Sequence, residues 1–117
     1  MMTEAATEFV RPLTFEALSQ KPVYTRMFPD SGDPEIQHVH LAGWPDLILV
    51  APATANLIGK CALGLGDDLA SATLLAAQAP VLWAPAMESH ITRLLPRSEV
   101  CGGADVSVIL SSSVVQY

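Results

Sequence analysis

Residues 46–56 constrain the fold of this 117-residue chain more than any other stretch. They read Asp-Leu-Ile-Leu-Val-Ala-Pro-Ala-Thr-Ala-Asn, an apolar run that leads into a turn and then into helix-forming residues. An apolar run without polar alternation is typical of a parallel strand buried on both faces. In an open parallel sheet, ligands bind where strands end, and free N–H groups at the start of the next helix favour anionic or carbonyl groups. The stretch predicts an α/β fold with a ligand site at Thr54 and Asn56.

Composition limits the possible functions. The length is typical of one domain, residues 1–117, and with half of the residues apolar and 15% charged a packed core is expected. The net charge of −6, without a basic patch, argues against nucleic acid as a partner. No apolar run is long enough to span a membrane, and the start lacks a signal-peptide pattern, so we expect no membrane partner and a cytoplasmic location. Cys61 and Cys101 make neither a disulfide framework nor a metal site.

The first third of the chain predicts short helices and a loop. Residues 1–9 favour a helix with Thr3 as its N-cap, and Pro12 opens a second helix. Residues 23–27 could form a short edge strand. Residues 28–35 contain two prolines, a glycine and three acids, which indicates a surface loop.

A second buried strand is predicted at residues 80–84. Between the two strands, residues 56–63 and 69–77 favour helices, and Asp67 or Asp68 caps the second of them. Strand, helix, helix and strand at this spacing predict a right-handed crossover between parallel strands.

Pro85-Ala86-Met87 ends the second strand as proline and small residues end the first. Both turns should therefore lie side by side on the carboxyl edge of the sheet, where we expect the ligand. Trp44 and Trp83, each beside one of these strands, should pack in the core. In the tail, residues 88–95 favour a short helix and residues 106–110 a last strand.

Several short segments in order, from Thr3 to Met87, support a closer assignment. With them the chain resembles the flavin-dependent cysteine decarboxylases, and among these the phosphopantothenoylcysteine decarboxylases. The resemblance implies a flavodoxin-like or Rossmann-like three-layer domain. The matching segments are Met2-Thr3-Glu4-Ala5-Ala6, residues 9–18, His38-Val39-His40-Leu41, Trp44-Pro45-Asp46-Leu47, residues 51–56, Asp67-Asp68-Leu69 and Ala84-Pro85-Ala86-Met87.

The resemblance also implies a reaction. In the family, FMN oxidises the cysteinyl thiol of 4′-phosphopantothenoylcysteine, CO2 is lost, and 4′-phosphopantetheine is formed in coenzyme A biosynthesis. His38 matches the family's catalytic histidine, and an imidazole suits a base because its ordinary pKa lies near neutral pH. Without the resemblance, His38 is better explained as a capping or surface histidine. If residues 36–41 are extended, His40 faces away from His38.

Five residues match the family's flavin contacts. Thr54, Ala55 and Asn56 match a flavin-contacting turn, where threonine and asparagine can both donate and accept hydrogen bonds. The alternative for this turn is an ordinary helix cap. Thr3 matches a hydroxyl residue near the FMN phosphate, although by itself it is an N-cap. Ala86 matches a position against the flavin ring, where a small side chain lets the backbone approach.

The chain also departs from the family. Family members begin with a strand, a Gly-rich phosphate turn and a helix, so this chain is expected to be an N-terminally truncated domain without its first strands. Met87 and Glu88 match the substrate-binding positions, but Glu88 replaces an asparagine and would repel a substrate carboxylate by about a few kcal/mol at an effective dielectric of about 20. Residues 88–117 form a divergent tail, in which Cys101-Gly102 only faintly resembles the family's substrate flap.

Two main hypotheses follow from the resemblance. The first is an FMN-dependent decarboxylase with His38 as base, which assembles as a homo-oligomer because family members are trimers with FMN at the subunit interface. The alternative is a non-catalytic relative that serves as an oligomeric binding or regulatory subunit, which Glu88 and the missing first strands favour. A generic nucleotide-binding fragment is a third option.

Overall fold

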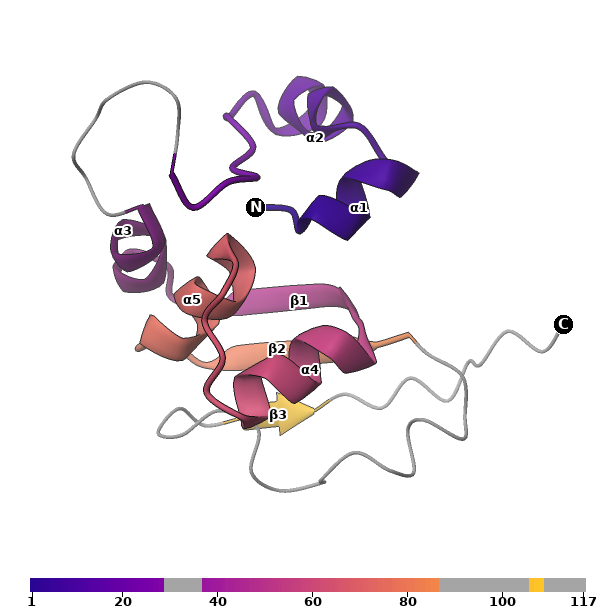
Figure 1. The fold of residues 1–117 in the computed structure, drawn as a ribbon. Coiled ribbons are helices and arrows are strands. Elements are labelled where there is room, and N and C mark those ends of the chain that lie inside the picture. Colours follow the sequence, from indigo (N-terminus) through magenta and orange to yellow (C-terminus); the bar gives the residue numbers. More distant parts are fainter. Residues whose placement is uncertain (29–36, 87–105, 109–117) are drawn as a thin grey trace, which may run out of the picture.

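The computed structural model describes residues 1–28, 37–86 and 106–108 (Figure 1). In this part of the chain, helices and parallel strands alternate as predicted from residue 48 onward, and the α/β class is confirmed. The helices are α1 (Glu4–Phe9), α2 (Pro12–Ser19), α3 (Gln37–Gly43), α4 (Ala55–Ala62) and α5 (Leu69–Ala76); the strands are β1 (Ile48–Ala53), β2 (Val81–Pro85) and β3 (Val106–Val108).

The sheet has the order β1-β2-β3, and both pairings are parallel. Ile48 pairs with Val81 and Val50 with Trp83, but Ala53 pairs with Pro85, so β1 contains one extra residue between Val50 and Ala53. Such a bulge bends a strand and changes the direction of the residues that follow it. The predicted crossover between parallel strands is confirmed, with α4 and α5 forming the connection.

Local sequence explains α4 and α5. The Thr54 hydroxyl accepts a hydrogen bond from the Leu57 N–H at 3.4 Å and so caps α4. At the start of α5, Asp68 and Ser71 form a capping box, in which the Asp68 carboxylate accepts from the Ser71 N–H at 2.8 Å. The sequence left open whether Asp67 or Asp68 caps this helix, and the structure assigns the cap to Asp68.

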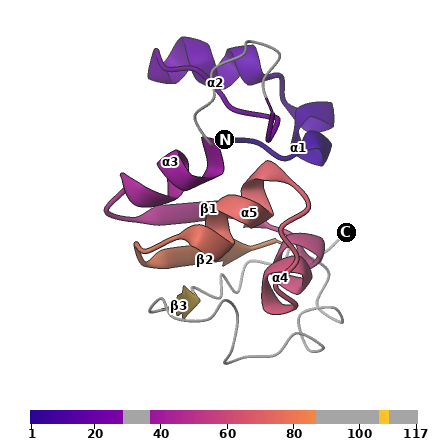
Figure 2. The same ribbon diagram turned by 60° about the vertical axis from the view of Figure 1, so that its left-hand side comes forward.

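The core lies between the sheet and these two helices. Val81 and Trp83 are 2% and 1% exposed and point to the face that α4 and α5 cover, where Ile48 and Val50 pack against them. In both views, α4 and α5 lie over the same side of the sheet (Figures 1 and 2). The buried cluster consists of Ala53, Leu57, Ile58, Cys61, Ala70, Leu74, Val81 and Trp83.

The other face of β1 is open, which contradicts the prediction that this strand is buried on both faces. Leu49 is 59% exposed, and Ala51 is exposed as well. The cause is that no described element covers this face of β1. The described residues therefore build two of the three predicted layers, the sheet and the helices on one side of it.

Trp44 was predicted to lie in the core, and this prediction is wrong. Its side chain is 63% exposed in the connection between α3 and β1, where the Lys21 ammonium lies 5.8 Å from the centroid of the ring. Trp44 precedes the first strand residue, so the alternation of the strand does not direct it inward. Trp83, which lies inside β2, is buried as predicted.

Residues 37–43 form the helix α3 and not the extended stretch considered for residues 36–41. In α3, His38, Leu41 and Ala42 recur at the helical spacing of three and four residues, and all three are partly or fully buried. This face packs against α5. His40 still points away from His38, because residues two positions apart on a helix differ by about 200°.

The two N-terminal helices begin where the sequence predicts. Thr3 caps α1 by accepting from the Ala6 N–H at 3.2 Å, and Pro12 is the first residue of α2. The short strand considered at residues 23–27 is absent from the described chain. Instead, the Val23 N–H donates to the Glu16 carboxylate at 3.1 Å, and a single backbone bond joins Met2 to Tyr24, so no strand ladder forms.

Candidate functional site

The carboxyl ends of β1 and β2 meet at one edge of the sheet. Ala53 pairs with Pro85, and the Ala86 N–H donates to the Ala53 carbonyl at 3.3 Å. The Ala51–Pro52 peptide bond in the first turn is cis. The prediction that the two proline-containing turns lie side by side is therefore confirmed.

Polar groups at this edge are free to meet a ligand. The Asn56 side chain is exposed and makes no hydrogen bond within the described part of the chain. The Thr54 hydroxyl is also exposed, and capping α4 uses it only as an acceptor, which leaves its O–H as a donor. Ala55 is half-buried, whereas Ala86, whose N–H donates to the carbonyl of the residue before Thr54, is exposed and has a small side chain.

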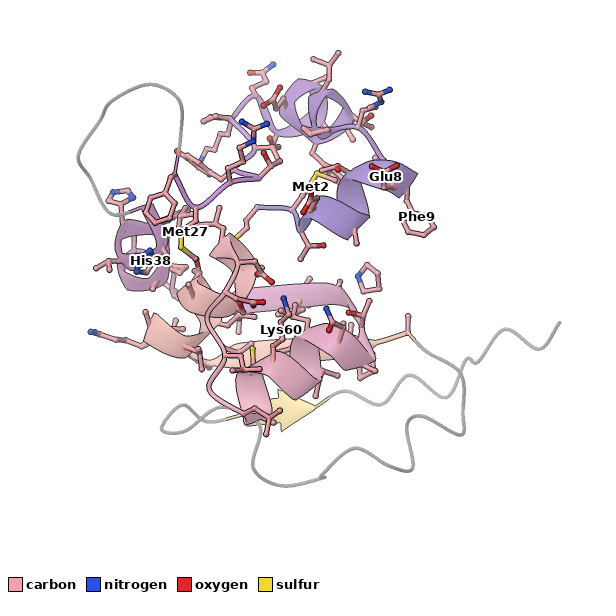
Figure 3. The ribbon with its side chains drawn as sticks, in the orientation of Figure 1. Met2, Glu8, Phe9, Met27, His38 and Lys60 are labelled. Carbon is pink, nitrogen blue, oxygen red and sulfur yellow. The ribbon has the colours of Figure 1, made fainter. Side chains whose placement is uncertain are left out.

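His38 lies apart from this edge. It belongs to α3, which lies toward the end of the sheet where β1 begins, whereas Thr54 follows the end of β1 (Figures 1 and 3). The side chain is half-buried, and its Nδ1 is buried without a hydrogen-bond partner among the described residues. No hydrogen bond joins His38 to Thr54, Asn56 or Ala86 within the same part of the structure.

Thr3 lies in a different place, beside a cavity of about 630 Å³ between α1, the segment around Arg26 and the start of α5. The edge residues Thr54, Asn56 and Ala86 are not among the described residues that line it. The predicted cofactor-binding residues thus fall into two groups, one at the edge of the sheet and one at this cavity. The lining includes Thr3, Thr7, Thr25, Arg26, Asp67 and Asp68.

Lys60 forms a two-carboxylate ion pair that the sequence analysis missed (Figure 3). Its Nζ lies 2.8 Å from Asp67 Oδ1 and 2.7 Å from Asp68 Oδ2. The hydrogen bond to Asp67, and next to it the one to Asp68, raise the pKa of Lys60 above its ordinary value, with the Asp67 bond making the larger contribution. Burial raises the pKa of Asp68, but hydrogen bonds from Lys60 and Ser71 outweigh it and hold that pKa below its ordinary value.

The signal for this ion pair is present in the chain but is not a helix spacing. Lys60 precedes the two acids by seven and eight residues, and the turn around Gly64 and Gly66 reverses the chain between them. Gly64 has a φ of 70°, in the left-handed region that glycine adopts without strain. A search for residues three or four apart therefore passes over the pair.

The predicted substrate-binding residues Met87 and Glu88 lie outside the described residues, as does Cys101. The same is true of the loop expected at residues 28–35, apart from Phe28, and of the helix expected at residues 88–95. The strand expected near the C-terminus is confirmed as β3, within the predicted range.

Residues 1–94 match the Flavoprotein family. The chain belongs to this family. The match covers every element described above except β3.

Two curated relatives place the chain within the family. It is 56% identical over 91 residues to the "Coenzyme A biosynthesis bifunctional protein CoaBC" of Bacillus subtilis (strain 168), which covers 78% of this chain and 22% of that protein. The protein of the same name from Mycobacterium bovis is 53% identical over 89 residues, which cover 76% of this chain and 21% of the relative. The chain thus spans less than a quarter of the length of these relatives.

Solved structures of similar fold include decarboxylases. A "PPC decarboxylase mutant C175S complexed with pantothenoylaminoethenethiol" has a TM-score of 0.70 at 27% identity, covering 92% of this chain and 63% of that chain. The "FMN-dependent Cysteine Decarboxylases SpaF" structure has a TM-score of 0.70 at 34% identity, covering 78% and 51%. The predicted flavodoxin-like fold is confirmed by this likeness.

The two groups of residues differ in how well they fit a flavin. The edge fits the ring, since the Asn56 amide has no hydrogen bond among the described residues, the Thr54 O–H remains a donor, and Ala86 is small. The cavity beside Thr3 does not fit a phosphate, because the described residues that line it include four acids and a single basic residue, Arg26. Among all the described residues of the chain, no helix is long and apolar enough to cross a membrane.

Proposed function

We propose that the chain supplies part of the site of an FMN-dependent decarboxylase that converts 4′-phosphopantothenoylcysteine to 4′-phosphopantetheine in coenzyme A biosynthesis, in the cytoplasm. The observation that supports this most is the hydrogen-bonded edge at Ala53 and Ala86, found in a chain that belongs to the Flavoprotein family and is 56% identical to a coenzyme A biosynthesis protein. Names of relatives such as "PPC decarboxylase" and "FMN-dependent Cysteine Decarboxylases" support the same reaction class.

In this proposal, the edge of the sheet holds the flavin ring. Asn56 and Thr54 hydrogen-bond to the polar rim of the ring, and Ala55 and Ala86 leave room for the backbone to approach it. FMN bound there would supply reversible two-electron chemistry: it would take two electrons from the cysteinyl thiol before CO2 leaves and return them to the resulting enethiol, so that the overall decarboxylation is redox-neutral. Met87 and Glu88 follow this edge in the sequence and are proposed to contact the substrate.

His38 is proposed to accept the proton of the cysteinyl thiol. We assign this transfer to Nε2, because Nδ1 is buried and out of reach of a substrate. Within one chain, His38 is not joined to the flavin edge by a hydrogen bond of the described residues. An assembly in which one subunit supplies His38 and its neighbour supplies the edge is consistent with this separation.

Exposed apolar side chains support a homo-oligomer, proposed to be a trimer. On α1 and α2, Phe9 is 90% exposed, Leu18 is 80% and Leu13 is 71%. Phe9 points away from the rest of the molecule at the end of α1 (Figure 3). Large apolar side chains exposed to this extent on two consecutive helices favour burial against another copy over contact with solvent.

A matched pair of histidine variants tests the proposed base. His38→Gln should lower the rate of CO2 release from 4′-phosphopantothenoylcysteine in the presence of FMN by about 10² to 10⁴ fold, the range for loss of a general base. His40→Gln, an exposed change on the same helix, should leave the rate nearly unchanged. Equal rates for the two variants would remove His38 from the mechanism.

The substitution Glu88→Asn separates the enzyme from the alternative of a non-catalytic binding or regulatory subunit. Replacing the carboxylate by the family's amide removes the expected repulsion of the substrate carboxylate. A gain in the rate of CO2 release would support an enzyme limited by Glu88. An unchanged absence of turnover, with flavin bound, would support the binding subunit.

A further inference from the structure

We draw no further inference here: the strongest candidate, the exposed face of β1 at Leu49 and Ala51, is an unpartnered sheet surface, and nothing in the described part of the chain shows what covers it.

Discussion

The unit formed by β1, α4, α5 and β2 and the pair formed by α1 and α2 differ in how they are held in place. Helix α5 buries five of its eight residues and α4 buries three, whereas neither α1 nor α2 has a buried residue. Both views place α1 and α2 on the β1 side of the sheet, away from β3 (Figure 2).

This difference shows that two regions with similar helix signals can have different sources of stability. All four helices have N-terminal signals in the sequence, a side-chain cap or a proline. Only α4 and α5 bury an apolar face against the sheet, and most of a helix's stability in a protein comes from such packing. The α1–α2 pair gains little from its own chain and is the part that a second subunit would stabilise.

The largest expected effect comes from Trp83. Trp83→Ala should lower the free energy of unfolding by about 3–5 kcal/mol, because it leaves a cavity in the buried cluster. Trp44→Ala, which truncates a tryptophan that is 63% exposed, should change it by less than about 1 kcal/mol. Urea titrations of both variants measure the difference. Similar losses would show that the Trp44 side of the molecule is as well packed as the core.

A charge on the apolar surface of α1 should dissociate the proposed oligomer. Phe9→Asp places a carboxylate on a residue that is 90% exposed in the single chain, so a folded monomer should tolerate it while an apolar interface should not. Sedimentation velocity should show loss of the oligomer. Leu63→Asp, at a leucine that is 76% exposed after α4, should leave the assembly intact. A monomeric parent chain would contradict the proposal directly.

Two helix caps should differ in their effect on stability. Asp68→Ala removes the cap of α5 and should cost about 1–2 kcal/mol, near the upper part of the range for caps, because Lys60 also loses a partner. Thr3→Ala removes the cap of α1 and should cost less than about 0.5 kcal/mol in global unfolding, since α1 buries nothing. Thermal or urea unfolding of both variants makes this comparison, and a larger loss for Thr3→Ala would reverse it.

The smallest effect concerns pH. Because the pKa of Asp68 lies below its ordinary value of 3.8 in the folded chain, its contribution is present above that value and is lost as the pH falls through the lower folded pKa. The pKa of Lys60 is raised above 10.5, so its contribution is present below 10.5 and is lost as the pH rises through the folded pKa. Asp68→Asn should flatten the acid side of a stability profile. If the variant loses stability at acid pH as steeply as the parent chain does, other carboxylates determine the loss of stability at acid pH.

Sequence alone predicted the parts of the fold that local chemistry determines. The strands β1, β2 and β3, a helix cap at Asp67 or Asp68, and the meeting of the two turns at Ala53 and Ala86 follow from apolar runs and capping residues. The exposure of Leu49 and Trp44 did not follow, because burial depends on which elements cover a face and not on the apolarity of the residue.

The candidate site was predictable only in part, for a related reason. Thr54, Asn56 and Ala86 were placed together because parallel strands end at one edge. Thr3 and His38 are on other elements, and their distance from that edge depends on how those elements pack, which residue types and spacing do not specify. The Lys60 ion pair was missed because it spans a turn between two helices.

The hydrogen bond from the Ala86 N–H to the Ala53 carbonyl joins two turns that lie 33 positions apart in the chain. It can form only while β1 and β2 are paired up to their carboxyl ends, so its presence indicates that the sheet is intact at this edge. A ligand that contacts both turns would stabilise this hydrogen bond. Its binding free energy would oppose local opening of the sheet at this edge. Hydrogen exchange at the Ala86 amide would then report occupancy of the edge more directly than any spectral change in the ligand.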